Sequence, residues 1–160
     1  MANYSQNTLT VRSNEKKISQ REFIEFQHVN IIHDENTDAT GLSFKGLLPM
    51  PKDYAPSDKE FKKHGGRNTP VEYIWNCEHW GCKNDCITNR ITKSENELII
   101  MYETPWLIGE DWLNEIAAVY SNLEFEFSCF EESGEYEAIG FVKNGTWQWE
   151  IYEPARWRDE

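Results

Sequence analysis

Apolar and polar residues alternate along several short segments of the chain, and this two-residue period is typical of β-strands with one buried face. The alternation is strict over residues 123–129, LEFEFSC, where Glu124 and Glu126 share the polar face. The same kind of pattern predicts further strands at residues 8–11, 42–48, 87–92, 97–102, 136–142 and 146–152. Asn144-Gly145 separates the last two and favours a tight hairpin turn, because a type I′ turn needs two positive φ angles.

Apolar residues at helical spacing predict two main helices and one short helix. The clearest stripe, over residues 110–121, consists of Trp112, Leu113, Ile116, Ala117 and Tyr120. A first helix is expected to begin at Ser19, because Ser19 and Glu22 fit a capping box ahead of two phenylalanines. A second capping box, residues 69–72 (TPVE), predicts a short helix with Pro70 at its first position.

The order of these elements predicts a single α+β domain over residues 1–160. We expect a ferredoxin-like antiparallel sheet with helices packed on one face, an inserted loop or short helix, and an additional C-terminal β-hairpin. The insertion is placed at residues 52–68, which are rich in charge and run into Gly65-Gly66, so this segment is expected to be mobile and partly helical. Aromatic residues make up 14% of the chain and should supply much of the core.

The formal net charge of −12 is distributed unevenly along the chain. Residues 1–93 contain 13 Lys and Arg against 12 Asp and Glu, a balance of +1, whereas residues 94–160 contain 3 against 16, a balance of −13. This acidic excess is either a solubilising surface or a face that binds a basic partner. The candidate docking residues are Glu124, Glu126, Glu135 and Glu137. Direct binding of nucleic acid is disfavoured, because phosphate contacts need cations.

The sequence predicts a cytoplasmic protein that does not engage a membrane. No apolar run is long enough to span a bilayer, and the first residues, MANYSQNTLTVRS, lack the apolar core of a secretory signal. Four cysteines at uneven spacing then indicate reduced thiols rather than a disulfide framework.

Residues 75–86, WNCEHWGCKNDC, combine cysteines, a histidine and two tryptophans. Cys77, His79, Cys82 and Cys86 are chemically suited to zinc, but their spacing lacks the two close pairs of common zinc sites. We therefore expect thiols without a metal or cofactor, with a zinc-stabilised binding module kept as an alternative. Catalysis by Cys77 with His79 is not supported, because neighbours two apart on a helix do not face each other. No catalytic residue is predicted, and the protein is expected not to be an enzyme.

A second interpretation of the same segment is a pocket for a small, nucleotide-like ligand. Trp80, Lys83, Asp85 and Trp106 are its candidate residues, since a ring can stack on a base and a cation can pair with a phosphate. The alternative for Trp80 is a place in the core, with Gly81 permitting the turn that follows.

Four separated motifs resemble a known family. They are MANY at residues 1–4, LLPMP at 47–51, EHWGCK at 78–83 and YETPW at 102–106. Their order and spacing are similar to those of the YubB-type ferredoxin-like family of small proteins carried by phages and plasmids, and the resemblance covers most of residues 1–142. Cys82, Asn84 and Cys86 replace the threonine, second tryptophan and alanine of the family's central motif. The resemblance implies a fold and a mobile-element context, without an enzymatic activity.

Charge and resemblance together predict a small acidic interaction protein of a phage or mobile element in the host cytoplasm. It would bind a host or phage protein with a basic surface and so inhibit a defence or nucleic-acid-handling system. The alternating Trp147 and Trp149 of the last strand are expected to cover the core, or to join two copies of the chain if that strand lies at an edge.

Overall fold

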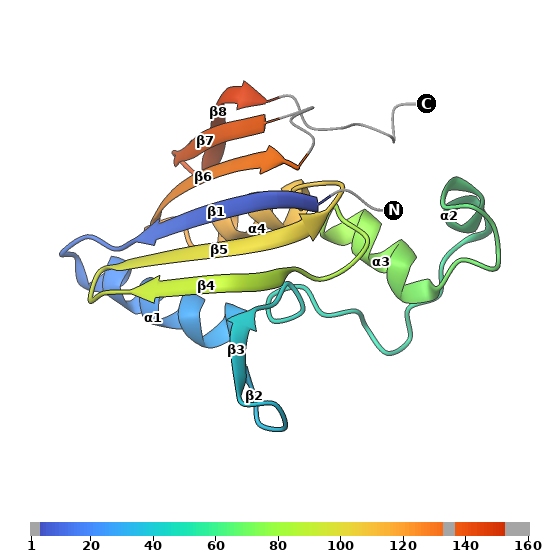
Figure 1. Ribbon diagram of the computed structural model, residues 1–160, viewed down its shortest axis with the longest axis horizontal. Helices are drawn as coiled ribbons and strands as arrows, with labels where there is room; N and C mark the ends of the chain where they lie inside the picture. The colour runs from blue at the N-terminus through green and yellow to red at the C-terminus, as the bar shows by residue number, and fades with distance from the viewer. Residues whose placement is uncertain (1–3, 133–136, 153–160) are drawn as a thin grey trace.

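The fold is an α+β arrangement in which helices cover one face of a six-stranded antiparallel sheet (Figure 1). The computed structural model describes residues 4–132 and 137–152. The strands of the sheet, in spatial order, are β4 (Ile87–Lys93), β5 (Glu97–Pro105), β1 (Tyr4–Arg12), β6 (Glu124–Glu131), β7 (Glu137–Lys143) and β8 (Thr146–Tyr152). The helices are α1 (Lys17–Asn30), α2 (Asp58–Lys63), α3 (Val71–His79) and α4 (Glu110–Val119).

The predicted ferredoxin-like fold is confirmed by the strand order. The units β1-α1-β4 and β5-α4-β6 interleave to give the order β4-β5-β1-β6, so β1 lies between β5 and β6. This is the split arrangement of ferredoxin-like sheets, in which each helix crosses from one strand to a strand two places away. The hairpin β7–β8 extends the sheet beyond β6, as expected for the additional C-terminal strands.

Alternating residues of the strands fill the space between the sheet and the helices. In β6, Phe125, Phe127 and Cys129 are buried while the residues between them are exposed, as the sequence pattern predicts. The apolar stripe of α4 is buried against the same face, with Trp112 fully enclosed. Trp147 of β8 completes this core, and its indole nitrogen donates a 2.8 Å hydrogen bond to the carbonyl of Leu113.

The predicted strand at residues 42–48 is wrong. The chain instead forms a separate two-stranded hairpin, β2 (Ile31–Asp34) with β3 (Ala39–Leu42), and residues 44–47 are turns. Phe44 is buried because this turn packs against the core, so the apolar spacing reflects tertiary contacts rather than a strand. The strand that follows the first helix in a ferredoxin-like fold is β4, which comes after α2 and α3 in the chain.

Both predicted capping boxes are wrong, although the helices exist. Helix α1 begins at Lys17, and the buried Ser19 hydroxyl accepts a hydrogen bond from the backbone N–H of Asn14. At α3 the Thr69 hydroxyl donates to the His64 carbonyl rather than capping the helix. A capping box does occur in residues 52–68, between Ser57 and Glu60 of α2, which confirms the helical character of that segment.

The C-terminal hairpin has the geometry that Asn144-Gly145 predicts. The φ angles of these residues are 55° and 76°, as a type I′ turn requires. Strand β8 lies at the edge of the sheet, and Trp147 and Trp149 pack inward against Phe127, which confirms that they cover the core. Association of two copies through β8 stays a prediction.

Candidate functional site

Helices α1 and α4 lie behind the sheet in Figure 1, and none of the described helices covers its front face. We call this surface the open face and define it by the outward positions of its four central strands. They are Glu97, Ile99, Met101 and Glu103 of β5, Gln6, Thr8, Thr10 and Arg12 of β1, Glu124, Glu126, Ser128 and Phe130 of β6, and Glu137, Ile139, Phe141 and Lys143 of β7.

The centre of the open face is apolar or neutral. The strand register places Met101, Thr8, Ser128 and Ile139 in one row across four strands. Phe141, in the next row on the same side of the sheet, is exposed like Met101 and Ile139. A depression of about 330 Å³ runs over this centre. Its outward-facing lining residues on β1, β6 and β7 are Thr8, Thr10, Glu126, Ser128, Ile139 and Phe141, and Glu150 of β8 joins them.

Glutamates lie toward both ends of the strands that form the open face. At one end Arg12 lies opposite Glu97 and Glu124, and at the other Glu137 lies opposite Phe130. Phe130 is 61% exposed, the most exposed large apolar residue of the face. The arrangement of an apolar centre and a charged margin is that of protein–protein interfaces.

The candidate glutamates are brought together only in part. Glu124, Glu126 and Glu137 share the open face, whereas Glu135 lies outside the described residues. Arg12 forms ion pairs with Glu97 at 2.7 Å and Glu126 at 3.1 Å, so one cation offsets part of the negative charge there. The acidic residues of α4 belong to the other side of the sheet, so the acidic excess of residues 94–160 is divided between two surfaces.

Trp80 lies in the core, which confirms the second of its two predicted placements. It is 1% exposed, its ring contacts Phe44 at 5.7 Å between centroids, and its indole nitrogen donates a 2.9 Å hydrogen bond to the Leu48 carbonyl. Gly81 follows with a φ of 87°, in the region where glycine is favoured. Trp80 is therefore inaccessible to a stacking ligand.

Asp85 holds two distant segments of the chain together. One carboxylate oxygen accepts a 2.6 Å hydrogen bond from the Ser43 hydroxyl and the other a 2.9 Å bond from the Phe44 backbone N–H. The second oxygen also accepts from the backbone N–H of Cys86. Because both oxygens are engaged within the protein, Asp85 fixes the turn that carries Phe44 into the core.

Lys83 and Trp106 do come together, at a small pocket of about 280 Å³. The other lining residues are Tyr73, Pro105 and Leu107. Trp106 is 37% exposed and has a φ of 66°, which is strained for a bulky residue. The Leu107 N–H donates to the Pro105 carbonyl at 2.8 Å, so Trp106 is the central residue of a γ-turn of the rare positive-φ type. This strained turn keeps the indole beside the pocket.

Three of the four zinc candidates have separate contacts, and the fourth, Cys77, is buried in α3. The His79 ring stacks on Trp75 with centroids 3.5 Å apart, and the Cys82 and Cys86 thiols donate to the carbonyls of Asn84 and Leu42. Among residues 4–132 and 137–152, no three His, Cys, Asp or Glu side chains are grouped so that they could hold a metal ion. Burial raises the pKa of the Cys86 thiol, which opposes formation of a nucleophilic thiolate.

Two features of these sites escaped the sequence reasoning. Tyr73 joins the Trp106 pocket from α3, and no local pattern marks it. The apolar centre of the open face does have a signal, because residues 98–102 (LIIMY) and 138–142 (AIGFV) lack polar residues at the outward positions of each strand. In a strand with only one buried face, apolar and polar residues would alternate at these positions. The continuous apolar character therefore marks the outward face as a candidate contact surface.

Comparison with known families gives one match. Residues 83–152 match the family described as "Ferredoxin-like domain in Api92-like protein". The match runs from the segment before β4 to the end of β8 and covers under half of the chain, so the similarity concerns this ferredoxin-like portion. The comparisons with curated proteins and with solved structures found no match. None of the described helices is both long and apolar enough to cross a membrane.

Proposed function

We propose that the protein is a non-enzymatic binding protein whose open face docks a protein partner. The observation that carries this proposal is the exposed apolar centre of an uncovered sheet with glutamates toward both strand ends. The complementary partner has a small apolar patch flanked by lysine or arginine. Burial of Met101, Ile139 and Phe141 would supply affinity, and the glutamates would steer the basic partner and fix its orientation.

The biological setting is part of the same proposal. The motif resemblance to the YubB-type family and the family match over residues 83–152 support a protein of a phage or other mobile element. A surface that engages lysine and arginine side chains also suits a partner that normally holds nucleic acid. We propose that the protein occupies such a surface on a host or phage protein and thereby interferes with a defence or nucleic-acid-handling system.

Reversal of charge on the open face is expected to weaken partner binding at least about tenfold, because long-range attraction becomes repulsion. The variant is Glu124→Lys/Glu126→Lys, and the measurement is affinity capture from host lysate followed by titration of the recovered partner at low and high salt. The matched control, Glu25→Lys/Glu72→Lys, makes the same charge change at exposed helix positions away from the open face and should bind like the wild type.

Ile139→Ser is a second variant for the open face, because Glu126 also pairs with Arg12 and its replacement can change stability. Ile139 is exposed, so its loss should spare the fold while it removes apolar contact with the partner. Binding that is insensitive to salt, to the paired charge reversal and to Ile139→Ser would contradict the proposal.

A second candidate function is supported by the Trp106 pocket, where the predicted Lys83 and Trp106 meet. A nucleotide that stacks on Trp106 and pairs its phosphate with Lys83 would raise the melting temperature. At a concentration of 100 times Kd, the free energy of unfolding would increase by about 2.7 kcal/mol. A thermal-shift panel of nucleoside monophosphates tests this. The shift should vanish in Trp106→Ala and in Lys83→Ala, and a panel without any shift would dismiss the small-ligand function.

A further inference from the structure

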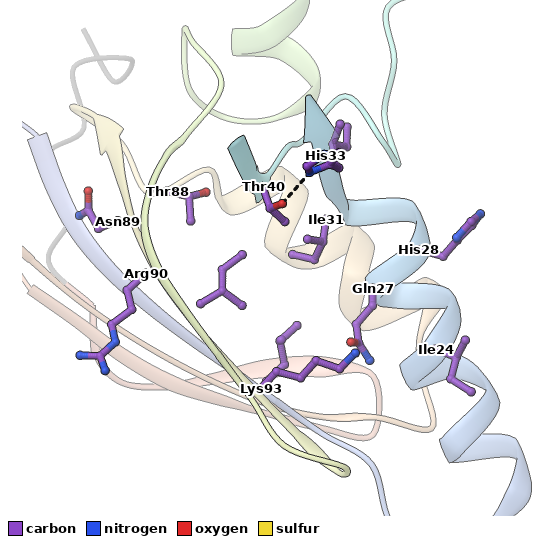
Figure 2. A pocket seen from close by; sticks show the side chains of 13 residues that line it. Ile24, Gln27, His28, Ile31, His33, Thr40, Thr88, Asn89, Arg90 and Lys93 are labelled. Carbon is purple, nitrogen blue, oxygen red and sulfur yellow. Dashed lines mark hydrogen bonds between the residues drawn. The ribbon is translucent and has the colours of Figure 1, made fainter. Parts of the chain in front are cut away.

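A groove of about 1020 Å³ lies on the opposite flank of the molecule from β8, between helix α1, the hairpin β2–β3 and the edge strand β4 (Figure 2). Its apolar residues are Ile24, Ile31, Ile32, Ile91 and Leu98. Ile24 is 67% exposed and Ile32 is also exposed, which makes this rim the second apolar surface of the protein. Neither the open face nor the Trp106 pocket shares a lining residue with the groove's apolar floor.

The charge of the groove is opposite to that of the protein as a whole. Its lining includes Arg90, Lys93, His28 and His33 and contains no carboxylate, although the chain has a net charge of −12. Within the part of the chain that the structure describes, neither Arg90 nor Lys93 has an ion-pair partner, whereas His33 contacts Asp38 and Thr40. An acidic group beside β4 would therefore meet Lys93 on the groove side of the strand or Arg90 on its other side, and neither cation is held in an ion pair within the described residues.

Strand β4 presents one free edge of its backbone to this groove. Among the described strands it pairs with β5 alone, and the hairpin β2–β3 contacts it near Thr88, whose hydroxyl accepts a hydrogen bond from the Leu42 N–H. A bulge lies between Thr88 and Arg90, and the register is regular from Arg90 to Lys93. An edge of this kind is a template for an added strand.

The two sides of β4 differ in a way that selects the added strand. Figure 2 shows Lys93 extending toward Gln27 of α1 and Ile31 facing into the groove, while Arg90 points to the other side of the strand. Residues of an added strand alternate between the same two sides. Apolar residues would then face Ile31 and Ile91, and acidic residues on the other side would face Arg90, with Lys93 at the groove's end.

We propose that this groove binds an extended, acidic segment of a partner protein as an additional strand on β4, with apolar residues alternating with carboxylates. Nucleic acid fits less well, because the groove has an apolar floor and no phenylalanine, tyrosine or tryptophan on which a base could stack. Pairing of β4 with β4 of a second copy fits less well too, because it would place Arg90 and Lys93 of both copies close together. The apolar floor of the groove and Lys93 are separate from the open face, and the two surfaces adjoin only at Arg90, which lies opposite Met101 in the sheet.

The test is fluorescence anisotropy with a labelled, terminally blocked heptapeptide in which glutamate and valine alternate. We expect saturable binding that weakens with salt and is at least tenfold tighter than that of the counterpart with lysine in place of glutamate. Arg90→Glu/Lys93→Glu should weaken binding at least tenfold. The matched control Lys45→Glu/Lys59→Glu changes the same charge at exposed positions outside the groove and should leave binding unchanged.

A second pair of peptides tests strand addition itself. The two peptides have N-methyl groups on opposite sets of alternate residues. The peptide whose methylated nitrogens face β4 should bind more weakly than the other, because only that set of N–H groups donates to the β4 backbone. Ile24→Ser, at an exposed rim position, should weaken binding without loss of the folded circular dichroism spectrum.

Several results would overturn the proposal. The lysine peptide could bind as tightly as the glutamate peptide, or Arg90→Glu/Lys93→Glu could leave binding of the glutamate peptide unchanged. A single-stranded oligonucleotide could displace the labelled peptide at a lower concentration than unlabelled peptide does. The protein could also self-associate in a way that Arg90→Glu/Lys93→Glu abolishes. Absence of any binding would overturn it as well.

Discussion

Trp80→Ala should lower the free energy of unfolding by about 3–5 kcal/mol, the usual range for a fully buried tryptophan. Trp80 contacts Phe44, which in turn contacts Trp112 at 4.6 Å between ring centroids, so the cavity would open in the aromatic centre of the core. Since small domains are stable by roughly 5–15 kcal/mol, the variant could be partly unfolded at 37 °C. Urea unfolding followed by circular dichroism measures the change.

Trp80→Phe separates the hydrogen bond from the packing. It keeps an aromatic ring but removes the donor to the Leu48 carbonyl, so a loss of about 1–3 kcal/mol is expected. Trp106→Ala is the matched control, because Trp106 is partly exposed and its replacement leaves the buried aromatic cluster around Phe44 intact. An unfolding free energy for Trp80→Ala within about 1 kcal/mol of the wild type would contradict the core placement.

Gly46→Ala should destabilise the protein by about 2 kcal/mol or more, since overpacking that displaces backbone commonly costs 1–3 kcal/mol. A Cβ at position 46 would overlap the carbonyl oxygen of Val29, near the end of α1. Backbone atoms cannot rotate aside as a flexible side chain can, so the turn at residues 44–47 must move. That turn holds Phe44 in the core, and its displacement would loosen the contacts with Trp80 and Trp112.

Lys45→Ala is the control for Gly46→Ala, because Lys45 lies in the same turn and its side chain is exposed. Its effect should stay within about 0.5 kcal/mol, as for other surface substitutions. Thermal and urea unfolding of the two variants side by side provide the measurement. If Gly46→Ala were as stable as Lys45→Ala, the turn would not pack against α1 as closely as described.

The parts of the fold that the sequence predicts well are those in which burial follows a local period. The alternation at residues 123–129 and the stripe on α4 depend on one flat interface between the sheet and the helices, so each residue's neighbours in sequence reveal its environment. The turn at residues 44–47 is different. Its position depends on Asp85, which is 41 residues from Phe44 in sequence, and no local pattern contains that hydrogen bond.

The candidate sites show the same division. The outward direction of Glu124 and Glu126 follows from alternation within their own strand. The local sequence does not reveal which tryptophan is buried, because both Trp80 and Trp106 adjoin residues that favour turns. A carbonyl at Leu48 receives the indole of Trp80, whereas a γ-turn keeps Trp106 at the surface, and both arrangements arise from contacts between distant segments.

The position of β1 in the sheet has a consequence for synthesis on the ribosome. Strand β1 is flanked by β5 and β6, whose residues pair with it as far along the chain as Glu131. A nascent chain can therefore complete the pairing of β1 only after Glu131 has left the exit tunnel. Until then the strand's apolar side chains and both hydrogen-bonding edges lack their final partners, so this interval is when the chain is most exposed to aggregation.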